Sequence, residues 1–398
     1  MRSGTVKTRN AALAALLAYA ALAGAPAWGA TACDPGEKSP GVAAGEIKLG
    51  ATMPLTGSAA AGGLGVSAGA RTYYDMINAA GGIKGRKVSY VVRDDEYKPA
   101  AAQQQMRALV QRDQVFAIAG GEGTPNFLAV VPLLEREKVP AIAPYAPSSE
   151  LGTMRTPHVF MTAVTYVTEF AIMTKHVMET AHPQSLSLVG VQGNVGDDAK
   201  AGMEQGAGPS VKLTYIPEVP GTPDFTPIAT QLRDAAAPWA FLILTNADTG
   251  QLLQAMQRIG YKPQTAAWPG MDDPDYLKAF APVSQGMVVA EETAPLDSAD
   301  PAVRKFVADF TKLAGHAPSK FEELGWSQAQ LVVKALQDAK ALTRSCLMEA
   351  LENTREFQTG ILPPITFGPD RRQGVNAVGL VEIRGDKTVE VVPFRSLD

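Results

Sequence analysis

The chain has 398 residues, of which 46% are hydrophobic and 19% are charged, a composition typical of a folded globular protein with more than one domain. Its formal net charge is −4, its sequence pI is about 5.7, and the body of the chain contains no block of Lys and Arg. These values argue against nucleic acid and anionic membrane surfaces as partners.

The N-terminus has the pattern of a secretory signal. Arg2, Lys7 and Arg9 precede an apolar run over residues 11–25, and small residues follow up to Ala32. A positive start, a short apolar run and small residues before a cleavage point are typical of a signal peptide, which we assign to residues 1–32. The apolar run is shorter than the ~20 residues that a spanning helix needs. We therefore expect an exported, periplasmic protein.

Two cysteines, Cys33 and Cys346, leave two possibilities for the mature N-terminus. Small residues precede Cys33, as in lipidated proteins, but Ala30 stands where a lipidation signal usually has a large aliphatic residue. An oxidising compartment favours a Cys33–Cys346 disulfide instead, and that bond would close a very long loop. We expect the disulfide, with lipid anchoring at Cys33 as the alternative.

The first structural unit predicted along the chain is a βαβ unit. An apolar strand over residues 46–53 leads through Pro54 into a Gly/Ala/Ser-rich loop, residues 57–65. A helix over residues 67–79 follows, with a buried face at three- and four-residue spacing, and a second strand covers residues 88–92. Ligands bind at the C-terminal ends of strands in parallel sheets, which places a candidate site beside this loop.

The strand–helix alternation continues through most of the chain and predicts an α/β fold with two doubly wound lobes and a ligand cleft between them. Further strands are expected at residues 116–119, 140–142, 185–191, 211–216, 239–245, 265–268, 287–290, 377–383 and 388–393. Helices are expected at residues 100–111, 127–137, 166–180, 197–206, 226–236, 249–259, 301–313, 321–339 and 343–353.

Catalytic and cofactor motifs are weak. The four histidines are scattered, which argues against a protein-built metal site. Ser67 fits the hydrolase pattern Gly-x-Ser-x-Gly, but about a dozen residues separate it from the preceding strand, and a nucleophile elbow follows its strand directly. The same distance argues against a dinucleotide fingerprint at residues 63–68. We expect no enzyme activity and no cofactor.

Several loops that follow strands carry candidate ligand-binding residues. Gly123 and Thr124 belong to a Gly-rich loop before a helix, where backbone N–H groups and a hydroxyl suit a ligand oxygen. Tyr145 and Trp268 could stack on a ligand, and Asn246 occupies an equivalent place in the second half.

Several motifs, in order, resemble the type I periplasmic solute-binding proteins of ABC transporters, in the branched-chain amino-acid group. They are residues 50–56, Gly81-Gly82-Ile83-Lys84-Gly85-Arg86, Asp94-Asp95, the Gly120–Thr124 loop and Gly286-Met287. The resemblance covers roughly residues 45–395. It implies two lobes joined by a three-crossover hinge, with segments at residues 46–163 and 291–368 in the N-lobe and 164–290 and 369–398 in the C-lobe. It also implies hinge closure on a small solute and delivery to ABC permease subunits. We expect a monomer.

The resemblance also implies a set of ligand contacts. Thr124 matches the hydroxyl that holds a ligand oxygen, Glu122 matches a pocket-lining neighbour, and the family's cleft tyrosine falls at Val195. The carboxylate that grips an ammonium group falls at about Pro269, so either Asp272 or Asp273 takes that role or the ligand is not an α-amino acid. The expected ligand is a small organic solute, an amino acid or a related carboxylate or amide, with aromatic character allowed. The complete set of expected contacts is Glu122, Gly123, Thr124, Tyr145, Ala146, Pro147, Ser148, Tyr166, Val195, Asn246, Trp268 and Asp272.

Two alternative functions stay open on the sequence. One is a sensory module of the same fold that signals to a receptor. The other is a secreted serine hydrolase that uses Ser67.

Overall fold

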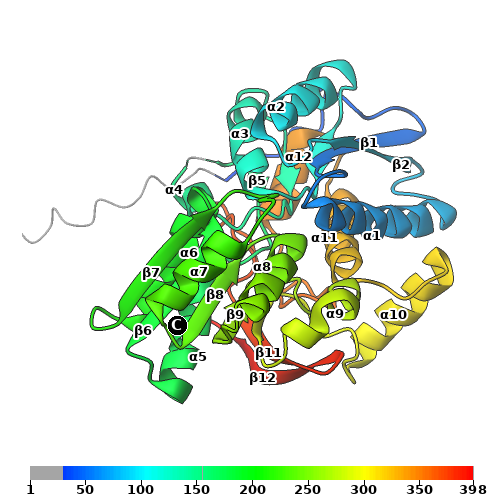
Figure 1. The fold of residues 1–398 in the computed structure, drawn as a ribbon. Helices are drawn as coiled ribbons and strands as arrows, with labels where there is room; N and C mark the ends of the chain where they lie inside the picture. The colour runs from blue at the N-terminus through cyan, green and yellow to red at the C-terminus, as the bar shows by residue number, and fades with distance from the viewer. Residues whose placement is uncertain (1–29, 155, 398) are drawn as a thin grey trace, which may run out of the picture.

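The computed structural model describes residues 30–154 and 156–397. The predicted signal peptide thus lies almost wholly outside the described residues. Two β-sheets organise the rest, and Figure 1 shows them as separate lobes, one in blue and cyan and one in green and red. The predicted α/β fold with two mostly parallel sheets is confirmed.

The first sheet has five parallel strands in the order β2-β1-β3-β4-β5. The three strands β3, β4 and β5 are buried along their whole length, as expected where helices cover both faces of a parallel sheet. The bounds are β1 Glu46–Met53, β2 Lys87–Asp94, β3 Ala117–Ala119, β4 Ala141–Ile142 and β5 Val159–Phe160.

The second sheet repeats this strand order and extends it. Its parallel part runs β7-β6-β8-β9-β10, and a C-terminal hairpin of β11 and β12 adds two antiparallel strands beside β10. In each lobe the order reverses at the first strand, between β1 and β3 and between β6 and β8. The bounds are β6 Ser185–Val191, β7 Lys212–Glu218, β8 Trp239–Ile243, β9 Gln264–Ala267, β10 Val288–Glu291, β11 Val378–Arg384 and β12 Lys387–Arg395.

Helices connect the strands of both sheets. The α-helices are α1 Ala60–Ala79, α2 Pro99–Arg107, α3 Thr124–Arg136, α4 Ser149–Thr153, α5 Tyr166–Ala181, α6 Asn194–Ala207, α7 Thr226–Ala235, α8 Asn246–Arg258, α9 Pro274–Phe280, α10 Pro301–Ala314, α11 Lys320–Asp338 and α12 Arg344–Glu352. A π-helical turn, Ala108–Arg112, extends α2, and a 3₁₀ turn, Ala281–Val283, follows α9. The sequence did not predict α4, β5 or α9.

Helix α1 begins earlier than the sequence predicts, because its glycines serve close packing and not a loop. A Cβ atom on Gly63 would lie 2.0 Å from the Pro54 carbonyl oxygen, and one on Gly69 would lie 2.0 Å from that of Glu322. On the facing helix α11, a Cβ on Gly325 would lie 2.0 Å from the Val66 carbonyl oxygen. Only glycine permits this approach of the two backbones, so α1 and α11 pack as one unit.

The chain passes three times between the lobes. The first passage lies between β5 and α5, the second follows β10, and the third lies between Gly374 and β11. The first two are bonded together, because the Val164 N–H donates to Glu292 at 3.0 Å. The third comes later than the predicted boundary after residue 368, because Gln373 still pairs with Met161 at the end of β5.

The segment before β1 is fixed to α12. Cys33 and Cys346 form a disulfide, and Cys346 lies in the first turn of α12. At the other end of this helix, the Thr31 N–H and hydroxyl each donate to the Glu352 carboxylate at 2.8 Å. Glu352 is also paired with the buried Arg372 at 2.7 Å.

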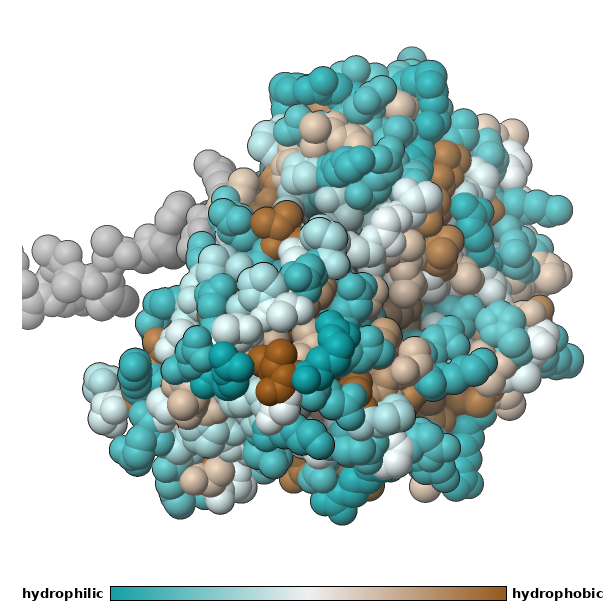
Figure 2. Space-filling view, in the orientation of Figure 1, coloured by the Kyte–Doolittle hydropathy of each residue, from teal (hydrophilic) through white to brown (hydrophobic). Residues whose placement is uncertain are grey.

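The surface is largely hydrophilic on the face shown in Figure 2, and its strongly apolar residues occur as small separate patches. Among the described residues, the large hydrophobic side chains that are exposed are Leu64, Val219, Leu313 and Val389. Within the same residues, no helix is both long enough and apolar enough to cross a membrane.

Candidate functional site: a cavity between the two lobes

A cavity lies where the two sheets face each other, with about 530 Å³ of empty space that includes the open solvent at its mouth. Its wall includes the loop and first turn after β1, the loop after β3, the ends of β6 and β8 and the residues that follow them. These are the places where strand order reverses in each lobe, which is where open α/β sheets bind ligands. We call this space the cleft cavity.

The cleft cavity has an apolar and aromatic wall. Aliphatic side chains come from the second lobe, and four aromatic residues come from loops and helices of both lobes. Its lining residues are Ser58, Ala59, Ala61, Gly62, Tyr97, Glu122, Thr124, Tyr166, Val191, Val195, Ile243, Leu244, Thr245, Asn246, Trp268 and Phe321. None of these residues is Lys, Arg or His.

The first-lobe side of the cavity carries a carboxyl group without a partner. Glu122 follows β3, and its Oε2 atom is buried with no hydrogen-bond partner. Burial, and then the nearby Asp95, raise the pKa of Glu122 to about 8. Beside it, the Thr124 hydroxyl and the Tyr166 hydroxyl lie 3.0 Å apart and share one hydrogen bond. One hydroxyl hydrogen of this pair therefore remains free.

More acidic groups surround the Tyr97 side of the cavity. Asp95 follows β2 and accepts from the Asn126 amide at 2.6 Å, while its other oxygen has no partner. Glu218, at the end of β7, is 2% exposed, and neither of its carboxyl oxygens has a partner. Burial raises the pKa of Asp95 and of Glu218 to about 7 each. The fields of these two groups, of Glu122 and of Asp248 all act on Tyr97.

On the second-lobe side, most of the side-chain donors are already used within the protein, and one N–H of the Asn246 amide remains. The Trp268 indole N–H donates to the Leu244 carbonyl at 2.6 Å, and the Asn246 amide donates to the Gly270 carbonyl at 2.8 Å. The Thr245 hydroxyl donates to Asp248 at 2.8 Å and caps α8. This wall consequently offers a ligand mainly apolar surface.

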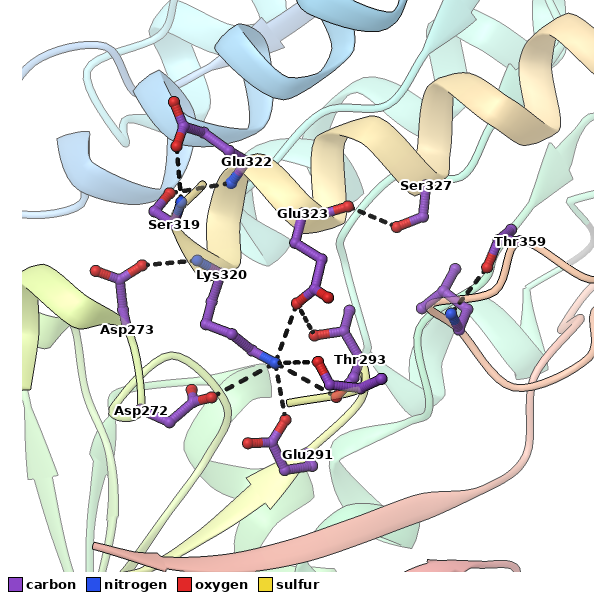
Figure 3. Close-up of polar contacts among 12 residues, drawn as sticks. Asp272, Asp273, Glu291, Thr293, Ser319, Lys320, Glu322, Glu323, Ser327 and Thr359 are labelled. Atoms are coloured by element: carbon purple, nitrogen blue, oxygen red, sulfur yellow. Dashed lines mark hydrogen bonds and ion pairs between the residues drawn. The ribbon is translucent and has the colours of Figure 1, made fainter. Parts of the chain in front are cut away.

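A second buried polar group lies between the lobes, next to the cavity. Lys320, at the start of α11, lies 3.5 Å from Asp272, 3.1 Å from Glu291 and 3.1 Å from Glu323 (Figure 3). We call these four residues the Lys320 cluster. Burial opposes a charge on Lys320, but the three carboxylates prevail and raise its pKa well above the ordinary value. Carbonyl oxygens of Thr293 and Ala294 also accept from its ammonium, at 3.4 and 3.0 Å.

Figure 3 also shows how the start of α11 is fixed. Ser319 and Glu322 form a capping box, and the Lys320 backbone N–H donates to Asp273 of the second lobe at 3.0 Å. Burial raises the pKa of Asp273 to about 6. The loop after β9 is therefore bonded to α11 through the side chain and the backbone of one residue.

The cavity contains half of the expected contacts. Those that line it are Glu122, Thr124, Tyr166, Val195, Asn246 and Trp268. Asp272 instead faces Lys320, and Tyr145 lines a separate small cavity together with Glu291, Glu292 and Lys320.

The other expected residues have structural contacts. Ser148 caps α4 by accepting from the Glu150 N–H at 3.2 Å, and the Pro147 carbonyl accepts from the Tyr166 N–H at 2.8 Å. Ala146 is fully buried, and the Gly123 N–H donates to the Tyr145 carbonyl at 3.3 Å. None of these residues is among those that line the cleft cavity.

The sequence analysis missed two aromatic residues of the cavity. Tyr97 follows β2, and its position after the strand-ending Asp94-Asp95 pair could have indicated it. Phe321 lies on α11, far along the chain, and no local pattern distinguishes it from a core residue.

A model of the periplasmic binding protein family matches residues 46–388. The chain belongs to this family. The Leu/Ile/Val-binding protein BraC3 of Rhizobium johnstonii is 24% identical over 375 residues, which cover 92% of this chain and 93% of that protein. The Leu/Ile/Val-binding protein homolog 3 of Brucella melitensis biotype 1 is 26% identical over 245 residues, or 61% of this chain and 66% of that protein.

A solved structure shares the fold of this periplasmic binding protein. It is that of a fatty acid ABC transporter substrate-binding protein from Thermomonospora curvata, with a TM-score of 0.83 and 23% identity over 91% of this chain and 95% of that chain. The resemblance inferred from the sequence motifs is thereby confirmed, and relatives with this fold are substrate-binding proteins of ABC transporters.

The geometry of Ser67 differs from that of a hydrolase nucleophile. Ser67 lies within α1, well past its first turn, and is 9% exposed. A nucleophile elbow would instead place the serine at a strained turn directly after a strand. In the part of the chain that the structure describes, no three His, Cys, Asp or Glu residues are grouped so that they could hold a metal ion.

Proposed function

We propose that this periplasmic binding protein captures a small organic solute in the cleft cavity, closes its lobes over it and presents the closed form to an ABC permease. The observation that carries the proposal is the position of the cavity at the strand-order reversals of both sheets, with walls from both lobes. A solute bound there contacts both lobes only when they are closed, so binding shifts the population toward the closed form. We propose that it binds without catalysis and acts as a monomer.

The closed arrangement is supported by polar contacts on two sides of the cavity. On one side, Ser149 of α4 donates its N–H and its hydroxyl to Asp198 of α6, at 2.7 and 2.5 Å. On the other side, the Lys320 cluster connects α11 with the loop after β9. Both sets of contacts join first-lobe elements to second-lobe elements. An open form would have to break both.

Of the two carboxylates expected to grip an amino acid's ammonium group, Asp272 is engaged by the protein's own ammonium. It lies 3.5 Å from Lys320 Nζ, and Asp273 accepts backbone N–H groups of Asp275 and Lys320. A ligand ammonium at this position would have to displace a buried cation that is shared by three carboxylates. We therefore propose that the solute is not an α-amino acid held through Asp272.

Calorimetry of the purified protein against L-leucine, aromatic acids, amides and amines tests this function. We expect one site per chain, loss of binding when Val195 is replaced by Trp to fill the cavity, and a dissociation constant for leucine well above micromolar. The variant Val389→Trp, at an exposed position of β12, is the control. Tight leucine binding would contradict the ligand assignment, and undiminished binding by Val195→Trp would contradict the site.

We also propose that the protein is exported and that the mature chain retains Thr31. Two hydrogen bonds of 2.8 Å connect Thr31 to the buried carboxylate of Glu352. Cleavage after Ala32 would remove both bonds, whereas cleavage after Ala27, which also follows small residues, would keep them. Intact mass measurement of the protein from a periplasmic extract tests both parts. An unprocessed mass contradicts export, and a mass that begins at Cys33 contradicts only the cleavage position.

A further inference from the structure

The structure contains a buried acidic group for which the protein supplies no cation, and it lines the cleft cavity. Glu122 Oε2 has no partner, and among the described residues no Lys, Arg or His lines the cavity. In the adjacent Lys320 cluster, by contrast, three carboxylates share one ammonium. We propose that the solute is an organic ammonium ion without a carboxylate, whose charged nitrogen lies against Glu122 and among the aromatic rings of the cavity. This inference rests on the proposed binding function and names its ligand class.

The hydrogen-bonding groups of the cavity favour a donor on the ligand. The Trp268 indole N–H and the Thr245 hydroxyl are already bonded inside the protein, and the Asn246 amide gives one of its two N–H groups to Gly270. The remaining polar groups of the wall include the Glu122 carboxyl, one free hydroxyl hydrogen of the Thr124–Tyr166 pair, the second Asn246 N–H and the hydroxyls of Tyr97 and Ser58. A protonated Glu122 can donate to a ligand, but an ionised Glu122 repels a carboxylate, whereas an ammonium group brings the donors that the ionised Glu122 lacks.

The aromatic residues of the cavity add a second, independent argument. Tyr97, Tyr166, Trp268 and Phe321 all line it. The faces of aromatic rings attract cations, and groups of such rings are how proteins recognise organic ammonium ions. The remaining wall, with Val191, Val195, Ile243 and Leu244, suits a short apolar body attached to the charged nitrogen.

The surrounding charges favour a cation and oppose an anion. Asp95 and Glu122 act on each other from the first lobe, and Glu218 and Asp248 act on Tyr97 from the second. Phosphate or carboxylate ligands would be repelled by all four once these are ionised. An ammonium ion instead lowers the cost of ionising Glu122 in its buried position.

If an ammonium ion binds beside Glu122, its binding should release a proton from the protein. With a pKa of about 8, Glu122 carries a proton at pH 7 in the free protein. An ammonium ion stabilises the ionised form, so the proton leaves and amine affinity rises with pH up to about 8, by about tenfold per pH unit if Glu122 alone titrates. Asp95 and Glu218, with pKa values of about 7, release protons in the same direction. Other titratable groups near this end of the cavity are Tyr97, Tyr166, Asp248 and, beside Tyr166, Glu169.

Four probes of similar shape test the proposal by calorimetry: isopentylamine, isovaleramide, isovalerate and L-leucine. We expect isopentylamine to bind at least tenfold more tightly than each of the others, with proton release detected in buffers of different ionisation enthalpy. Glu122→Gln should lower amine affinity by about a hundredfold, since a buried cation loses its counter-charge. It should also abolish most of the proton release. Glu390→Gln, at an exposed position of β12, is the matched control.

Any other order of affinities among the four probes contradicts the inference. If isovaleramide binds as tightly as the amine, the charge is not recognised. If isovalerate or leucine binds more tightly, the ligand class is wrong while the binding function stands. If none of the four binds, the inference fails, and the proposed function is decided separately by the wider ligand panel and the Val195→Trp variant described above. Equal amine affinity in Glu122→Gln and the parent protein would exclude Glu122 as the partner.

Discussion

Among the buried carboxylates between the lobes, the Lys320 cluster and the group around Glu122 differ in whether they contain a cation. The Lys320 cluster contains its own cation, and it also draws on backbone carbonyls. Glu122 and its neighbours in the cleft cavity contain none. The Lys320 cluster is buried throughout, whereas Glu122 is partly exposed where it lines the cavity, so the two groups differ in composition and in access to a ligand. On the proposal made above, the first group stabilises the closed fold by itself, while the second is completed by the bound solute.

Removal of the cation from the Lys320 cluster should give the largest effect. Lys320→Met leaves Asp272, Glu291 and Glu323 buried together without a counter-charge, and loss of one partner of a buried ion pair costs about 3–5 kcal/mol. Urea unfolding at pH 7 measures the loss, and part of it should be recovered at pH 5 as the carboxylates become protonated. Lys305→Met, which removes an exposed pair with Asp309, is the control and should change little. A small effect for Lys320→Met would show that this cluster does not stabilise the fold.

Asp272→Asn separates a structural role from a ligand role. Two carboxylates remain to hold Lys320, so we expect a loss of about 1–3 kcal/mol of unfolding free energy, as for a weakened charged hydrogen bond. Amine affinity should change much less than in Glu122→Gln. Thermal unfolding and calorimetry on both variants make the comparison. A loss of affinity without a loss of stability would return Asp272 to the role of ligand contact.

The free protein should lose stability as pH rises from about 5 to 8. Asp95, Glu122 and Glu218 have raised pKa values when folded, so their contribution is fully present below the unfolded pKa values near 4 and is lost as pH passes 7 to 8. Urea unfolding across this range should show a shallower decline for Glu122→Gln. Saturating isopentylamine should also flatten the decline, because it stabilises the ionised form. An unchanged slope in the variant would mean that Glu122 does not titrate in this range.

Tyr166→Phe should give the smallest effect. It removes the hydroxyl that pairs with Thr124 and leaves the ring in the cavity, so we expect about 0.5–1.5 kcal/mol less stability. Amine affinity should fall less than tenfold, since the cation–π contribution of the ring remains. Thermal unfolding and calorimetry with isopentylamine measure the two quantities. A loss as large as that of Glu122→Gln would move the main polar contact from the carboxylate to the hydroxyl.

The sequence was sufficient for the alternation of strands and helices, because hydrophobic spacing is a local property. Strand β6 and the start of α5 agree with the structure to the residue, and the C-terminal hairpin was placed correctly. The prediction from sequence failed at the start of α1, where glycines that are typical of a loop instead allow the helix to pack closely against α11. Short elements such as α4 and β5 carry too few residues for a period to be recognised.

Candidate site residues could be predicted only where they follow a strand. Glu122, Thr124, Asn246 and Trp268 were found in this way, and all line the cavity. The partner of Asp272 was not found, because Lys320 comes from another segment and meets it only when the lobes are together. Phe321 was missed for the same reason.

Lys320 and Phe321 are consecutive residues at the start of one rigid helix, yet the first belongs to the ion cluster and the second to the cavity wall. A movement of α11 that brings the Lys320 ammonium to its three carboxylates therefore also brings the Phe321 ring to the cavity wall. Engineering the cleft cavity for a ligand of another shape would therefore have to consider positions 320 and 321 together, because a shift of the helix moves both side chains.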